Sequence, residues 1–192
     1  MKPMEHALNG YGATTLYSLV SYIPGLIGSF LNDLRTELVS TCRLRSHVTI
    51  LPPRVLSTPS SELVTNLRRR ARDLKGFEIV LGDLAIFPVT NVIYIPIASG
   101  ALDVVEMHGQ LAQGTLAYAE PFPFHPHITA AQEIPPETVQ DVYQLALRRW
   151  VEWPGPRNFN VDELVFVKNV NQTGWQTLSR HPLISPSLLR TG

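Results

Sequence analysis

Two stretches of the chain, SHVTILPP at residues 46–53 and FPFHPHITAA at residues 122–131, follow one pattern. In each, a histidine is followed by an apolar residue, a threonine and another apolar residue, which gives HVTI at 47–50 and HITA at 127–130. Side chains of a β-strand alternate between its two faces, so a strand over either tetrad puts the histidine and the threonine on one face. The sequence therefore predicts two strands that each present an imidazole beside a hydroxyl.

These residue types suit chemistry at a phosphoester. An imidazole takes up or gives a proton near neutral pH, and a hydroxyl donates a hydrogen bond to a phosphate oxygen. Two such pairs that face one groove make a phosphoester site that needs no metal. The candidate catalytic residues are His47 and His127, and the candidate phosphate-binding residues are Thr49 and Thr129.

Composition limits the class of protein. The chain has 192 residues, 44% of them hydrophobic and 17% charged, which is typical of a globular domain. Its 16 basic and 16 acidic side chains give no net charge, whereas proteins that bind duplex nucleic acid carry broad positive surfaces. A nucleic acid partner must then be small or be held by a local patch. The one cysteine, Cys42, cannot form an internal disulfide, which favours a reducing cytoplasm.

The segment at residues 7–32 has no charged residue and is long enough to suggest a membrane span. Several Ser and Thr residues make it too polar for that, and Pro24-Gly25 interrupts it near the middle. We interpret it as a strand at 16–23, a turn and the start of a helix at 26–40. The sequence therefore predicts no membrane partner.

The tetrads lie 80 positions apart in two halves of similar pattern. In each half a helix precedes the tetrad strand, and a proline pair, Pro52-Pro53 or Pro135-Pro136, is expected to stop it because proline cannot continue a ladder. We expect the first lobe to close after a hairpin that ends near residue 97, and the second half to repeat the order. Residues 159–170 are expected to form one strand.

At these residues the sequence resembles the two-histidine (2H) phosphoesterase superfamily, in particular bacterial 2′-5′ RNA ligase-like and cyclic phosphodiesterase proteins, whose mark is a pair of His-x-(Thr/Ser)-hydrophobic tetrads. The resemblance covers about residues 16–183 and implies an α+β fold of two pseudo-symmetric lobes. Each lobe would be an antiparallel sheet with helices on its outer face, and the active groove would lie between the lobes. We expect a loose leader at 1–12, a single bilobal domain at 13–184 and a frayed tail at 185–192.

The function that the resemblance implies is opening of a 2′,3′-cyclic phosphate on an RNA end or a small nucleotide, with 2′-5′ RNA ligation as the reverse reaction. It implies neither a metal nor another cofactor. One histidine would act as base and the other as acid, with the threonines holding the non-bridging oxygens. Which histidine takes which role, the physiological substrate and the oligomeric state stay open.

Neighbouring residues are candidates for support. Arg45 and His125 lie two positions before the tetrad histidines, so strand periodicity directs both toward the groove or, as strand-end residues, to solvent. Phe122 and Phe124 are candidates to stack on a base at the groove mouth, or else are core residues. The basic run at residues 68–75 is typical of a solvated helix face.

Three other interpretations remain open. His125-x-His127 has a spacing that metals accept, although no HExxH motif or cysteine pair supplies the further ligands that zinc needs. A non-catalytic RNA- or nucleotide-binding module with the same groove is the alternative function. A structural role for both histidines as satisfied core residues is the third.

Overall fold

The computed structural model describes residues 15–170 and 174–185. The expected leader, nearly all of the expected tail and most of the turn expected at 171–174 lie outside the described residues. The strands are β1 Thr15–Tyr22, β2 His47–Val55, β3 Phe77–Leu81, β4 Ala85–Ile86, β5 Ile93–Ser99, β6 His127–Ala131, β7 Asn158–Val161, β8 Glu163–Val170 and β9 Trp175–Pro182. The helices are α1 Gly25–Leu38, α2 Ser60–Ala71, α3 Ala101–Leu111 and α4 Val139–Glu152, with a 3-10 turn, η1, at Gly114–Leu116.

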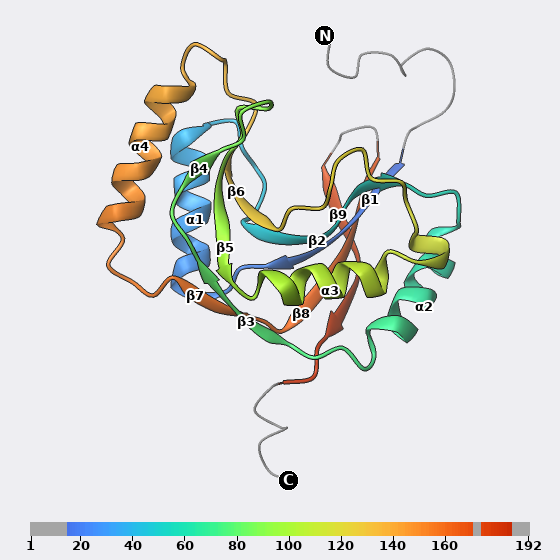
Figure 1. Cartoon of the computed structure of the whole chain (residues 1–192). Coiled ribbons are helices and arrows are strands. Elements are labelled where there is room, and N and C mark those ends of the chain that lie inside the picture. The colour runs from blue at the N-terminus through green and yellow to red at the C-terminus, as the bar shows by residue number, and fades with distance from the viewer. Residues whose placement is uncertain (1–14, 171–173, 186–192) are drawn as a thin grey trace, which may run out of the picture.

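The strands form two antiparallel sheets, as the α+β prediction requires. The first sheet has the order β2-β1-β8-β9, and the second has the order β4-β5-β3-β7 with β6 paired to β5. Helices α2 and α3 pack against the first sheet through β9 and β2, whereas α1 packs against β6 of the second sheet and against α4 (Figure 1). Within the described residues no helix is long and apolar enough to cross a membrane.

The lobes do not correspond to the two halves of the chain, so the expectation that the first lobe closes near residue 97 is wrong. The first sheet joins β1 and β2 to β8 and β9, and the second takes every strand from β3 to β7. Residues 159–170, expected to form one strand, divide at Asp162: β7 pairs with β3, and β8 pairs with β1. Both segments alternate alike, and alternation does not encode which sheet a strand joins.

The first tetrad strand also runs further than predicted, through Pro52-Pro53 to Val55. Strand β2 lies at the edge of its sheet, where a proline removes no bond to a second neighbour. The ladder between β1 and β2 shifts register between Tyr17 and Val20, where the prolines lie opposite. An edge position and a bulge are the two settings in which a strand tolerates proline.

Burial of the apolar tetrad residues orients both tetrads. Val48, Ile50 and Ile128 are fully buried, and Ala130 is nearly so. They belong to one core cluster that reaches through both sheets and the helices on them. Because the strand alternates, the histidine and threonine of each tetrad point away from that core. The hydrophobic pattern thus fixes which face of each tetrad strand meets the groove.

Candidate active site

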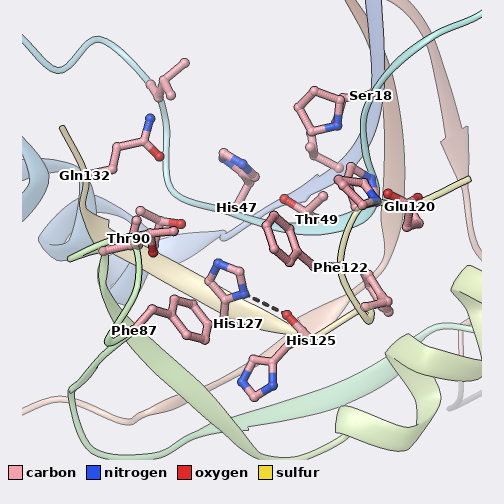
Figure 2. A pocket seen from close by; sticks show the side chains of 18 of the residues that line it. Ser18, His47, Thr49, Phe87, Thr90, Glu120, Phe122, His125, His127 and Gln132 are labelled. Atoms are coloured by element: carbon pink, nitrogen blue, oxygen red, sulfur yellow. Dashed lines mark hydrogen bonds between the residues drawn. The ribbon is translucent and has the colours of Figure 1, made fainter. Parts of the chain in front are cut away.

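The two tetrads meet at one groove with a cavity volume of about 660 Å³. His47 and Thr49 on β2 line it from the first sheet, and His127 and Thr129 on β6 line it from the second (Figure 2). All four side chains are partly exposed, in contrast to the buried apolar residues between them. The structure therefore brings together the four residues that the sequence singled out from positions 80 apart.

A backbone carbonyl holds each tetrad histidine. Nδ1 of His47 lies 2.7 Å from the carbonyl oxygen of Arg45. Nδ1 of His127 lies 2.7 Å from the carbonyl oxygen of His125 (Figure 2). A carbonyl oxygen only accepts hydrogen bonds, so Nδ1 of each ring must carry the proton and donate it. In the neutral ring, Nε2 then keeps its lone pair, which makes each imidazole a potential proton acceptor.

Burial favours the neutral form of both rings. Burial is the largest cause of the lowered pKa of His47, which falls from 6.5 to about 4. The positive charges of Arg35 and His127 act in the same direction, and the hydrogen bond to the Arg45 carbonyl acts against them. Burial also lowers the pKa of His127, although the hydrogen bond to the His125 carbonyl acts to raise it. Both imidazoles are therefore neutral at pH 7 in the free protein. A bound phosphate anion would raise both pKa values and favour protonation of one ring.

Aromatic rings pack edge-on against both imidazoles. Tyr22, opposite His47 on the neighbouring strand β1, meets its ring at 86° with centroids 6.4 Å apart. The Tyr94 ring on β5 lies at 76° to the His127 ring, with centroids 5.6 Å apart. The Phe87 ring stacks on Tyr94 with centroids 3.8 Å apart, and it lies at 82° to the His127 ring. Sequence reasoning missed these tyrosines, because only the strand pairing shows that each lies beside a tetrad histidine.

The predicted supporting residues, Arg45 and His125, also line the groove. Both are exposed and lie before the first residue of β2 and of β6, so the strand periodicity does not apply to them. Ring contacts hold them instead. The Arg45 guanidinium lies 4.3 Å above the Tyr22 ring, and the His125 ring meets Phe87 edge-on at 5.3 Å.

The two predicted stacking residues differ from each other. Phe122 is 71% exposed at the groove, where a ligand ring can reach it (Figure 2). Phe124 also lines the groove, but it stacks on His108 at 3.9 Å and packs against the core. His108 in turn bonds through Nδ1 to the Ile50 carbonyl at 2.7 Å. Phe124 thus combines a place in the groove wall with a place in the core.

Arg35 on α1 lines the groove and was not predicted. It is only 3% exposed and donates through Nη1 to the carbonyl of Thr129 and through Nη2 to Sγ of Cys42 at 3.6 Å. The sequence did carry a signal: Arg35 lies among Leu31, Leu34 and Leu38, on the apolar stripe of its helix. A charged residue on a buried helix face needs a reason.

A buried ion pair holds the part of the groove wall that precedes the second tetrad in the chain. Arg54 on β2 is 1% exposed and contacts Glu120, a groove-lining residue, at 2.5 Å. The same guanidinium donates to the carbonyl oxygens of Leu116 and Pro52, both at 2.9 Å. The segment between η1 and β6 is therefore tied to the strand that carries the first tetrad.

The possible metal site was tested on the described residues. Among residues 15–170 and 174–185, no group of three or more His, Cys, Asp or Glu side chains is placed to hold a metal ion. The groove presents His125 and His127 with their ring centroids 6.0 Å apart. Zinc sites use three or four protein ligands.

Known proteins are similar to this chain in sequence or in fold. A family model described as the 2′-5′ RNA ligase superfamily matches residues 31–173. A Geobacillus kaustophilus protein named "Putative phosphoesterase" is 29% identical over 143 residues, which are 69% of this chain and 78% of that protein. The crystal structure of E. coli LigT in apo form gives a TM-score of 0.59 at 18% identity, over 90% of this chain and 99% of LigT. LigT complexed with 3′-AMP gives 0.57 at 17% identity, with the same coverage.

Proposed function

The chain belongs to the 2′-5′ RNA ligase superfamily, and from this membership we propose that it is a metal-independent phosphodiesterase that opens 2′,3′-cyclic phosphates on RNA ends or nucleotides. Family and fold support the coarser statement, an enzyme of the two-histidine phosphoesterase type. One observation carries the proposal: His47 and His127 line a single groove, each with Nδ1 bonded to a backbone carbonyl. Each ring thus keeps Nε2 for proton transfer.

The proposed reaction uses both imidazoles at one phosphorus. One neutral histidine accepts a proton from water, and the water oxygen forms a bond to phosphorus. The bond from phosphorus to one ribose oxygen breaks, and the second histidine, protonated when the anion binds, gives its proton to that oxygen. Thr49 and Thr129 donate hydrogen bonds to the non-bridging oxygens and stabilise their charge in the five-coordinate state. In ligation a ribose 5′-hydroxyl takes the place of water: its oxygen forms the bond to phosphorus, the bond from phosphorus to the 3′-oxygen breaks, and a 2′-5′ linkage results. Cleavage of that linkage follows this path in reverse, with the roles of the histidines exchanged.

A nucleotide is the ligand class that we propose for the groove. LigT, which shares the fold, has been crystallised with 3′-AMP. In this chain Phe122 offers an exposed ring beside the groove, on which a base can stack. Arg45 and His125 add positive charge next to the tetrads when protonated. We further propose that residues 13–184 act as one bilobal domain, and that the enzyme works in the cytoplasm, as its single cysteine suggests.

The test is a screen of 2′,3′-cyclic nucleotides, oligonucleotides that end in a cyclic phosphate, and 2′-5′-linked dinucleotides, with a chelator present. The position of the product phosphate is determined for each substrate. His47→Ala and His127→Ala should each abolish turnover while affinity for the product changes less than about tenfold, or roughly 1.4 kcal/mol. The matched control is Thr65→Ala on α2, whose hydroxyl bonds only to the Ser61 carbonyl. Equal turnover in a histidine variant and the wild type would rule out this mechanism, and binding without turnover of any substrate would favour the binding module.

A further inference from the structure

The guanidinium of Arg35 is a buried charge beside the groove. Its side chain is 3% exposed, and α1 inserts it beneath β6, where Nη1 bonds to the Thr129 carbonyl. Its Nε atom is buried and has no hydrogen-bond partner within residues 15–170 and 174–185. Buried donors that lack a partner are rare in folded proteins, and an unpartnered charged donor is the least favourable kind.

Arg35 has no acidic partner among the described residues. The ion pairs found there join Arg54 to Glu120, Arg149 to Glu37, Arg157 to Asp83 and Arg180 to Glu163. Arg54 makes the useful comparison, because it is equally buried and does contact a carboxylate. Arg35 contacts only a neutral carbonyl and a thiol.

A buried charge without a counter-charge is too unfavourable to be a device for stability. A buried donor that lacks a partner beside a groove points to a functional role, in which a ligand completes the pairing. Arg35 lines the same groove as the two tetrads, so an anion held between His47 and His127 is the counter-charge within reach of its field. A phosphate group has the required charge.

We propose that Arg35 is a positioning residue whose buried guanidinium supplies the fixed positive charge for the substrate phosphate, holds β6 in place through the Thr129 carbonyl, and makes His47 the proton acceptor. The proposal rests on the proposed function in taking the phosphate of the substrate as the anion. It also assigns the two histidines different roles, with His127 as the proton donor in ring opening.

The charges around His47 agree with this division. Arg35 faces it from α1, His127 from β6 and Arg45 from its own strand end, while Tyr22 packs on it from β1. Burial lowers the pKa of His47 to about 4, and the charge of Arg35 acts in the same direction. His127, whose pKa burial also lowers, has His125 rather than Arg35 as its positive neighbour. The charge of Arg35 therefore favours the neutral form of His47, which is the form that accepts a proton.

Three variants test the proposal: Arg35→Met removes the charge, Arg35→Lys keeps it, and Arg43→Met is the matched control. Arg43 is exposed, does not line the groove, and bonds only to the carbonyls of Ser40 and Cys42. In the Arg35→Met variant, inorganic phosphate should bind about tenfold more weakly or worse, which is ~1.4 kcal/mol. The Arg35→Lys and Arg43→Met variants should stay close to the wild type.

The pH profile of turnover separates positioning from simple structural support. Without the Arg35 charge the pKa of His47 rises, so the acid limb of kcat/KM should move up by about one pH unit in Arg35→Met. In Arg35→Lys the acid limb of kcat/KM should lie at the same pH as in the wild type, even if kcat is lower. Phosphate affinity and acid limb both unchanged in Arg35→Met would overturn the proposal.

A measurement on the wild-type chain covers the case in which Arg35→Met does not fold. The Nε–H resonance of Arg35 should shift as inorganic phosphate is added, while that of Arg43 stays in place. No shift of the Arg35 signal at saturating phosphate would overturn the proposal. Phosphate binding that depends on Arg35, together with no turnover of any cyclic phosphate by the wild type, would contradict the proposed function and the roles of the two histidines, and would support Arg35 as the charge that binds phosphate.

Discussion

His47 and His127 are held alike although they come from different sheets: Nδ1 of each ring lies 2.7 Å from the carbonyl oxygen two residues earlier. Both rings therefore adopt the same tautomer and keep Nε2 for the substrate. Each ring also packs edge-on against a tyrosine of the neighbouring strand, Tyr22 or Tyr94. The pseudo-symmetry of the lobes thus extends from the tetrads to the contacts that orient them.

The paired histidines predict a pH optimum below neutrality. Turnover needs one ring neutral and the other protonated, and in the free enzyme the pKa of His47 is about 4 while that of His127 is lowered from 6.5. We expect kcat/KM for a cyclic nucleotide to have a bell-shaped dependence on pH, with its maximum below pH 6.5. A profile that still rises above pH 7 would contradict this mechanism.

The same titration predicts how stability depends on pH. The pKa of His47 is lower in the folded chain, about 4, than in the unfolded chain, 6.5, so the unfolded state binds the proton first as the pH falls. Stability is then full above pH 6.5 and is lost between 6.5 and 4, by roughly 2–3 kcal/mol at pH 4.5. Urea unfolding at pH 7 and 4.5 measures this loss. His47→Gln should lose less than the wild type, and equal losses would show that His47 is not responsible.

The ion pair of Arg54 and Glu120 should stabilise the groove wall. Arg54→Met leaves the Glu120 carboxylate, 18% exposed, without its partner and frees the carbonyls that Arg54 binds. Breaking a buried pair on one side destabilises a protein by about 3–5 kcal/mol. The control is Arg180→Met, which removes an exposed pair with Glu163 and should change the free energy of unfolding by less than ~1 kcal/mol. Equal effects of the two variants would mean that the wall does not depend on Arg54.

The site was predictable where a local rule decides it. A histidine and a threonine two positions apart share a strand face, and the apolar residues between them, Val48 and Ile128, are buried as that rule requires. The α+β class and two antiparallel sheets also followed from the tetrads and the resemblance they carry. Local alternation was sufficient for the faces of the tetrad strands, whereas the fold class came from the resemblance.

Features that depend on contacts between distant residues were not predictable. The assignment of β7 and β8 to different sheets is decided by their partners, and Asp162 alone separates them. The prolines in β2 are tolerated because that strand is an edge, which only the finished sheet reveals. The place of Arg35 in the groove depends on the packing of α1 against β6, where Arg35 bonds to Thr129, 94 positions away in the chain.

Phe122 and Phe124 should respond differently to truncation. Phe122 is 71% exposed, so Phe122→Ala should leave stability within about 0.5 kcal/mol while KM for a base-bearing substrate rises. A lost stacking contact of about 1–3 kcal/mol corresponds to roughly a 5- to 150-fold change in affinity. Phe124 stacks on His108 and packs on the core, so Phe124→Ala should destabilise the fold by about 2–4 kcal/mol. Unchanged KM in Phe122→Ala would exclude its role in stacking.

The charges at the groove predict little advantage of long substrates over short ones. Among the described residues that line it, the arginines are Arg35 and Arg45, and the basic run at 68–75 contributes none. A single strand held through one or two phosphates gives a salt slope of about −1. We therefore expect kcat/KM to differ by less than about tenfold between a cyclic mononucleotide and a ten-residue oligonucleotide, with that shallow slope for both. Arg69→Met, a change within the basic run, should alter neither value. An oligonucleotide advantage above a hundredfold that Arg69→Met removes would show instead that the outer face of α2 binds the RNA backbone.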